Sequence, residues 1–140
     1  MNETKHISAF LKNNHLLTLC ANTHSDLWCA SCYYVFDQKQ MSLFIMTSDS
    51  SHHSQLMMLN KNIVGTIAPQ PQNIIDIKGI QFKGDIEKLR DKAAERANTL
   101  YYTTFPEAKF ISAPIWRIKL TMIKMTDNSL TFGKKLFWHQ

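Results

Sequence analysis

The chain has no long apolar segment, no low-complexity tract and no cluster of like charge. No window of its 140 residues approaches the roughly 20 consecutive apolar residues that a membrane-spanning helix needs. The first stretch, MNETKHISAFLKNNH, has no apolar core of signal-peptide length and no small-residue cleavage site. These absences predict a cytoplasmic protein with no membrane partner.

Charge is scarce and scattered. Charged residues make up 19% of the chain, too few for a disordered protein, so one globular domain over residues 1–140 is expected. The net charge of +5 favours an anionic partner in a general way. The longest basic run is Lys134-Lys135, however, whereas a nucleic-acid interface gathers its charges on one face or helix. We therefore expect no nucleic-acid partner.

Most motifs that indicate a known chemistry are also missing. The sequence contains no G-x-G-x-x-G, no Walker loop and no nucleophile elbow, and its carboxylates are dispersed, so no catalytic residue can be named. Cys29 and Cys32 form a C-x-x-C, but in a strand-like run, where these positions point to opposite faces. No second ligand pair accompanies them, so no metal site is predicted. A redox- or metal-sensing module that uses Cys29 and Cys32 is kept as a further hypothesis, ranked below those that follow.

The chain does contain apolar periodicity broken by short polar turns. Helical spacing or propensity predicts helices at 4–14, 51–59 and 88–104, with a further helical turn at 107–112. Apolar runs and alternation predict strands at 15–22, 27–37, 41–47, 62–69, 74–89, 115–128 and 130–139. Because most connections are too short for parallel crossovers, the strands should pair antiparallel. The expected class is α+β, mainly β: a barrel or sandwich of six or seven strands with flanking helices.

Residues 41–62 join a strand to a helix through a hydroxyl-rich turn. Ser51 precedes His52 and His53, which fall in the expected first turn of the helix. Hydroxyls, imidazoles and free backbone N–H groups at a helix start suit a phosphate or carboxylate. The same residues also fit a capped helix with two solvated histidines, so both interpretations stay open. Since adjacent helical residues diverge, His52 and His53 are not expected to share a metal ion.

The order of these segments resembles the pyridoxamine 5′-phosphate oxidase-like FMN-binding split barrels. The segments LWCASCYYVFD, GIQFKGDI, SAPIWRIKL and IKMTDNSLTFGKK are similar to those of the YhbP-like (UPF0306) group of that superfamily. The resemblance implies a six-stranded antiparallel split β-barrel, a homodimer and FMN in a groove at the dimer interface. The implied function is that of an uncharacterised FMN-binding flavoprotein, with flavin-dependent oxidoreductase activity on an unknown substrate as an open option.

The resemblance also implies cofactor contacts. They are Cys29, Ala30, Ser31, Cys32 and Tyr33 in one strand, Met46 and Thr47 in the next, Ser51, His52 and His53 for the phosphate, and Gly79 and Gln81 later. The family has Arg-Lys where this chain has His52-His53, and an Arg in place of Cys29. Because imidazoles are mostly neutral at pH 7, phosphate affinity should be weaker, and pyridoxamine phosphate oxidation is not supported. The alternative is a non-enzymatic module of the same fold that binds another anionic heterocycle or no cofactor.

Overall fold

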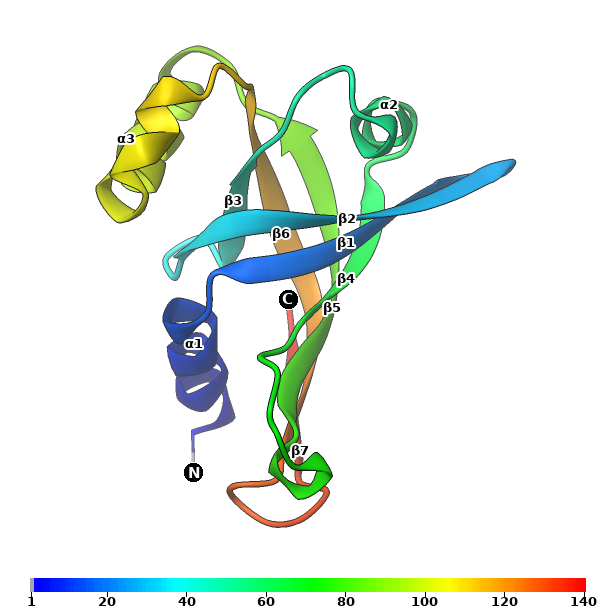
Figure 1. Cartoon of the computed structure of the whole chain (residues 1–140), viewed down its shortest axis with the longest axis vertical. Coiled ribbons are helices and arrows are strands. Elements are labelled where there is room, and N and C mark those ends of the chain that lie inside the picture. The colour runs from blue at the N-terminus through cyan, green and yellow to red at the C-terminus, as the bar shows by residue number, and fades with distance from the viewer. Residues whose placement is uncertain (1) are drawn as a thin grey trace.

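Alternating apolar residues place seven strands in one antiparallel sheet in the computed structural model, which describes residues 2–140 (Figure 1). The strands are β1 (Leu16–Thr23), β2 (Asp26–Asp37), β3 (Ser42–Met46), β4 (Asn62–Ile67), β5 (Lys78–Lys88), β6 (Ile115–Asp127) and β7 (Lys135–His139). The helices are α1 (Glu3–Asn13), α2 (His52–Leu59) and α3 (Asp91–Thr104), with short 3-10 segments η1 (Ile74–Asp76) and η2 (Pro106–Phe110). None of these helices has the length and apolar character that a bilayer crossing requires.

The sheet closes into a barrel. Its order is β3-β2-β1-β4-β5-β6-β7, and β3 also pairs with β6, so the strands from β3 to β6 form a ring. The last strand, β7, extends the sheet beyond β6 and lies outside this ring. Closure satisfies the backbone groups that an open sheet would leave at its edges. The predicted six-stranded barrel is confirmed, with β7 as an additional strand.

The barrel interior holds the larger of two apolar clusters. Inward-facing residues such as Leu19, Ile63 and Ile118 are at most 2% exposed. One end is covered by α1, whose predicted apolar face of Ile7, Phe10 and Leu11 is buried in this cluster. The smaller cluster lies beneath α3, at the other end of the molecule in Figure 1.

Three predicted boundaries were wrong, because features other than the local apolar alternation set where each element begins. The strand expected at 74–89 begins only at Lys78, since Ile74–Asp76 form η1, whose backbone is held by Asn128 Nδ2 donating to the Ile75 carbonyl at 3.0 Å. The strand expected at 130–139 begins at Lys135, because Gly133 adopts a φ of +76° in the preceding turn. The helix expected at 88–104 begins at Asp91, because β5 stays paired to β6 through Lys88.

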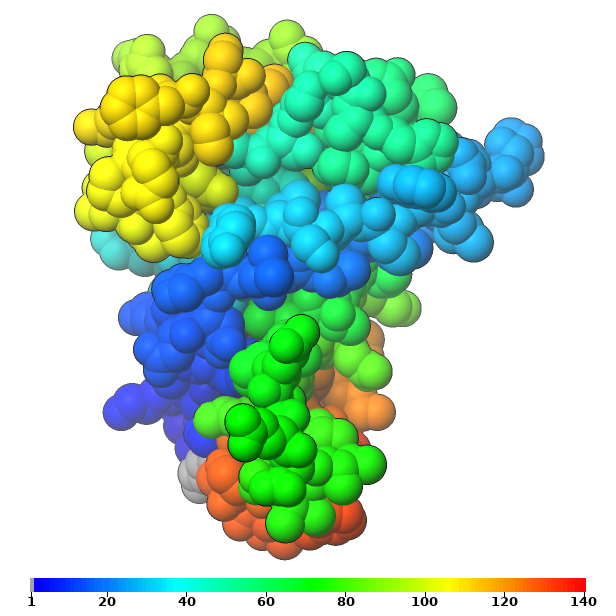
Figure 2. Space-filling view, in the orientation of Figure 1, coloured from blue at the N-terminus to red at the C-terminus, as the bar shows by residue number. Residues whose placement is uncertain are grey.

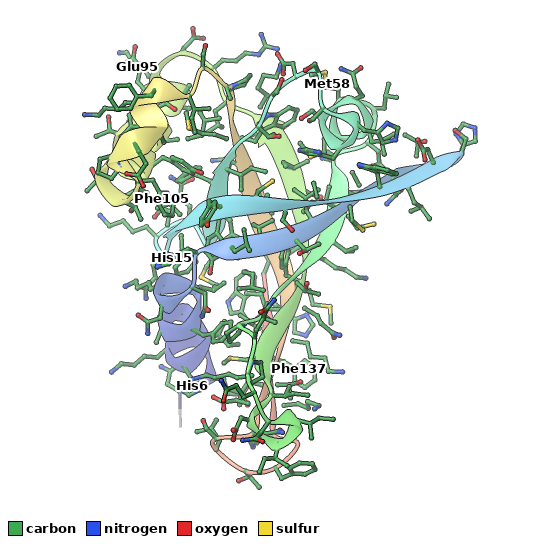
Figure 3. The ribbon with its side chains drawn as sticks, in the orientation of Figure 1. His6, His15, Met58, Glu95, Phe105 and Phe137 are labelled. Carbon is green, nitrogen blue, oxygen red and sulfur yellow. The ribbon has the colours of Figure 1, made fainter. Side chains whose placement is uncertain are left out.

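Asp127 is a fully buried carboxylate that links the end of β6 to α1. Its Oδ2 accepts a hydrogen bond from His6 Nε2 at 2.7 Å, and its Oδ1 accepts bonds from the backbone N and Oγ of Ser129 at 2.9 and 2.5 Å. His6 lies at the foot of α1 in Figure 3. Burial acts to raise the pKa of Asp127, but the bonds from Ser129 and His6 and the charge of Lys78 outweigh it, and the net pKa is lowered.

Replacing Asp127 with Asn should lower the free energy of unfolding at pH 7 by about 2 kcal/mol, because a buried, charge-assisted network loses its charge and one of its two acceptor oxygens. The folded-state pKa lies below the ordinary value of 3.8, so this contribution is present above pH 3.8 and is lost as the pH falls through the folded-state pKa. Urea denaturation at pH 7 and pH 3 should therefore show a smaller acid destabilisation in the variant than in the wild type. The exposed Asp76→Asn change is the control, and unchanged urea midpoints for Asp127→Asn would contradict the expectation.

Candidate functional site

Three polar side chains converge where β3 leads into α2. Ser51 caps the helix, with its Oγ accepting from the Ser54 backbone N at 3.3 Å. His53 Nε2 lies 2.6 Å from Thr47 Oγ1 and 3.3 Å from Ser51 Oγ. The structure thus brings together Thr47, Ser51 and His53, beside backbone N–H groups that have no acceptor within the helix. A cluster of this composition is suited to an oxyanion.

The imidazole of His53 has a lowered pKa. Burial lowers the pKa of its imidazole from 6.5, and the charge of His52 lowers it further. At pH 7 the ring therefore acts as a neutral hydrogen-bonding partner of Thr47. An anion placed between His53 and Ser51 would favour the cationic form of this ring.

The side chain of His52 points away from this cluster. Its Nε2 lies 2.7 Å from Asp26 Oδ2, at the start of β2, and its ring meets that of Trp28 edge-on at a centroid distance of 4.9 Å. The two adjacent histidines therefore diverge, as the helical geometry predicts. Figure 2 shows the β1–β2 hairpin projecting beyond the barrel next to α2, and the His52 contacts join these two elements.

A groove of about 440 Å³ lies on the outer face of the barrel. Its walls come from β1, β2, β4, β5 and β6, and Cys29 and Gln81, two of the predicted cofactor contacts, line it. The surface is largely apolar, through residues such as Val64, and Lys83 and Lys124 also line it. This combination suits a flat, apolar ligand with negative charge at its margin.

The other predicted contacts spread over β2, β3 and β5. Ser31 and Tyr33 face outward, and the Tyr33 ring packs edge-on against Phe105, which is labelled in Figure 3, at 5.6 Å between centroids. Met46 is half-buried and packs against the cluster beneath α3. Gly79 lies on β5 opposite Thr126. Two residues of β2, Ala30 and Cys32, are half-buried and buried, respectively.

A close relative identifies the family. A UPF0306 protein of Yersinia enterocolitica is 50% identical over 132 residues, which cover 94% of this chain and 90% of the relative. The chain belongs to the UPF0306 family. No family model matches it.

Solved structures resemble this UPF0306 protein in fold. The heme-binding protein from Mycobacterium smegmatis has a TM-score of 0.79 at 14% identity and covers 98% of this chain, which spans 56% of it. An FAD-binding protein from Mesorhizobium loti gives 0.70 at 12% identity, covering 85% and 90% of the two chains. A Listeria innocua protein named as a pyridoxamine 5′-phosphate oxidase gives 0.69 at 12%, covering 87% and 96%. At such identities the likeness shows the fold alone, and it confirms the oxidase-like split barrel.

The hypothesis of a redox- or metal-sensing pair, Cys29 and Cys32, gains no support from the structure of this UPF0306 protein. Cys29 is exposed on the outer face, whereas Cys32 is buried in the barrel core, where burial raises the pKa of its thiol to about 11. The two side chains lie on opposite faces of β2, so they cannot act together. Within residues 2–140 no group of three or more potential metal-binding side chains occurs.

Sequence reasoning missed the partner that Cys29 does have. Cys20 on β1 lies directly opposite Cys29 on β2, and both line the groove. The signal was present in the sequence. A hairpin with two residues between Thr23 and Asp26 fixes which residue of β1 lies opposite each residue of β2. Lys83 and Lys124 were also missed, since their approach to one groove depends on the pairing of β5 with β6.

Proposed function

We propose that this UPF0306 protein is a homodimeric flavoprotein that binds FMN, with the phosphate held where β3 leads into α2. The observation that carries the proposal is the convergence of Thr47, Ser51 and His53 at the start of a helix, with contacts of 2.6 to 3.3 Å. Support also comes from the split-barrel fold, which this chain shares with the Mesorhizobium loti FAD-binding protein and the Listeria innocua protein.

The side chains present fit a phosphate. The hydroxyl oxygens of Thr47 and Ser51 lie 2.6 and 3.3 Å from the same imidazole nitrogen, that of His53. A phosphate oxygen between them would accept from both hydroxyls, from the protonated ring and from the first backbone N–H groups of α2. His52, held by Asp26, would close one side of this site without contacting the phosphate.

The remaining predicted contacts would orient the ring system. The outward strand positions of β2, from Cys29 to Tyr33, would lie along one edge of it. Met46 would contact it from the neighbouring strand β3, and Gln81 from β5. Ala30, Cys32 and Gly79 would contribute backbone rather than side-chain atoms. When bound, the flavin would supply hydride-transfer chemistry, and the oxidoreductase substrate and electron donor are left open.

A homodimer and a cytoplasmic location are part of the proposal. Large apolar side chains stay exposed on the outer face of the barrel and on the hairpin, including Leu16 at 48%, Val64 at 43% and Leu27 at 68%. Such exposure is typical of a surface that a second subunit covers. The three cysteines are all free thiols, which suits a reducing compartment.

The test is a titration of the purified protein with FMN, followed by thermal unfolding and by the visible flavin spectrum. Binding to the folded state at about 100 times the dissociation constant should add roughly 2.7 kcal/mol of stability and raise the unfolding temperature. Riboflavin, which lacks the phosphate, should stabilise the protein much less. An unfolding temperature that does not change with saturating FMN would overturn the proposal, and bleaching of the bound flavin by NAD(P)H would favour a reductase.

A second candidate is a non-enzymatic module that binds another anionic heterocycle, such as heme. The position of Lys83 and Lys124 on the apolar groove favours it, because two ammonium groups suit the carboxylates of such a ligand. The Mycobacterium smegmatis heme-binding protein shares the fold. Stabilisation by heme without stabilisation by FMN, weakened in a Lys83→Gln, Lys124→Gln variant, would favour this candidate.

A further inference from the structure

The groove contains a pair of thiols whose geometry is set by the β1–β2 hairpin. Cys20 and Cys29 are directly opposite in the antiparallel pairing. Tyr34 N donates to the His15 carbonyl at 2.9 Å, which marks the pair formed by Leu16 and Tyr33 as a non-hydrogen-bonded one. Since the two kinds of pair alternate, Cys20 and Cys29, four positions along, are a non-hydrogen-bonded pair as well. In such pairs the Cα atoms are about 4.5 Å apart and the side chains are at their closest.

The neighbouring pair on the same face shows how close these side chains come. Thr18 and Ser31 lie two positions from the cysteines, in a pair of the same kind, and their Oγ atoms are 3.4 Å apart. Cys29 also acts on Cys20: partial burial first, then hydrogen bonding to Cys29 and the Cys29 charge, raise the pKa of Cys20. Both residues line the open groove, and Cys29 is the more exposed.

We propose that Cys20 and Cys29 form a reactive dithiol that a peroxide converts reversibly to a disulfide across the β1–β2 hairpin. A disulfide needs Cα atoms about 4.4 to 6.8 Å apart, and a non-hydrogen-bonded antiparallel pair lies at the short end of that range. Cys32 is excluded as a partner, because its side chain is buried on the other face of β2. This site is independent of the proposed FMN phosphate site.

The reaction balances with hydrogen peroxide as the oxidant. The thiolate of the more exposed Cys29 attacks one peroxide oxygen, the O–O bond breaks, and the departing hydroxide takes up a proton to become water. The sulfur of Cys20 then attacks the sulfenic sulfur of Cys29, the S–O bond breaks, and the second hydroxide leaves as water with the Cys20 proton. Two thiols lose two electrons in all, and one peroxide becomes two waters. A dithiol reductant reverses the change by thiol–disulfide exchange.

Oxidation would change the groove as well as the cysteines. The S–S bond would tie the two thiols together at the groove wall and remove two weak hydrogen-bond donors from it. Because the hairpin already places the two cysteines directly opposite each other on one face, the barrel does not have to rearrange for the bond to form. The disulfide would therefore act at the groove surface and leave the fold unchanged.

The experiment uses intact-mass spectrometry of the full chain, free of added flavin and kept native, before and after hydrogen peroxide. The wild type should lose about two mass units, recover them with dithiothreitol, and yield a Cys20–Cys29 cross-linked peptide. The Cys32→Ser variant is the matched control and should behave identically. The Cys20→Ser and Cys29→Ser variants should instead gain oxygen atoms, with unchanged circular dichroism showing that they fold.

Any of three results would overturn the proposal: a disulfide that includes Cys32, a covalent dimer on a non-reducing gel, or no two-unit loss in the native wild type. The assay needs no bound flavin. Failure of FMN to bind would therefore leave its outcome intact, and failure of the disulfide to form would leave the FMN proposal intact.

Discussion

Gly65→Ala should be among the most destabilising single methyl additions in this barrel, lowering the free energy of unfolding by about 3 kcal/mol. A Cβ on Gly65 would lie 2.5 Å from the Phe82 ring and 2.5 Å from the carbonyl oxygen of Thr18. The ring could turn only by displacing other core side chains, because Phe82 is 4% exposed. The carbonyl belongs to the neighbouring strand β1 and cannot move without breaking the β1–β4 pairing. The β4 strand therefore requires glycine where the Phe82 ring crosses it.

Thermal and urea denaturation would measure this effect, and we expect the unfolding temperature to fall by roughly 10 °C. Gly79→Ala on β5 is the matched control, because a Cβ there would lie 3.2 Å from its nearest neighbours and needs only a small adjustment. We expect it to change stability by less than about 1 kcal/mol. Adding Phe82→Leu to Gly65→Ala should restore only part of the loss, since the clash with Thr18 remains. Similar stabilities for the Gly65→Ala and Gly79→Ala variants would contradict this account of the packing.

Local sequence patterns predicted the elements that bury a single face, and those that are held by residues nearby in the sequence. The α1 face of Ile7, Phe10 and Leu11 follows from helical spacing, and Ser51 caps α2 because a short hydroxyl side chain satisfies a free N–H there. The same logic failed at Ile74 and Ile75. Alternation marked them as strand, yet they are 81% and 62% exposed in η1. A side chain some fifty positions later, Asn128, holds that turn, and no local pattern reports it.

The candidate site likewise has a part that residues close in sequence determine and a part that distant strands determine. Thr47, Ser51 and His53 meet because six residues of turn and helix bring them together; the sequence placed Ser51 and His53 at one helix start, and the family resemblance added Thr47. The opposed Cys20 and Cys29 were predictable from the hairpin register. The groove itself was not, because its walls include β5 and β6, and their positions depend on barrel closure through the β3–β6 pairing. The binding of His52 by Asp26 likewise required the hairpin to fold back over α2.

His53→Gln should weaken FMN binding about tenfold at pH 6 and remove the part of the pH dependence that comes from the imidazole. Glutamine keeps a hydrogen bond to Thr47 but cannot become cationic, and a charge-assisted bond to phosphate is worth roughly 1.4 kcal/mol more than a neutral one. Burial and His52 lower the pKa of His53 below 6.5 in the free protein, whereas a bound phosphate would raise it. Binding should therefore take up a proton, and affinity should fall as the pH rises from the free-protein pKa to that of the complex.

The measurement is a fluorescence titration of FMN at several pH values between 5.5 and 8, roughly the range over which an imidazole titrates. The phosphate of FMN also titrates near pH 6, so the wild type alone cannot assign the slope. That titration is common to every variant, however, and the difference between wild type and His53→Gln isolates the imidazole. His52→Gln is the control. Because Asp26 holds His52 away from the site, affinity should change little, and loss of the His52 charge should raise the pKa of His53 in the free protein and flatten the slope only in part. Equal slopes for wild type and His53→Gln would place the phosphate away from this imidazole, and a flat slope in His52→Gln would transfer the role to the neighbouring histidine.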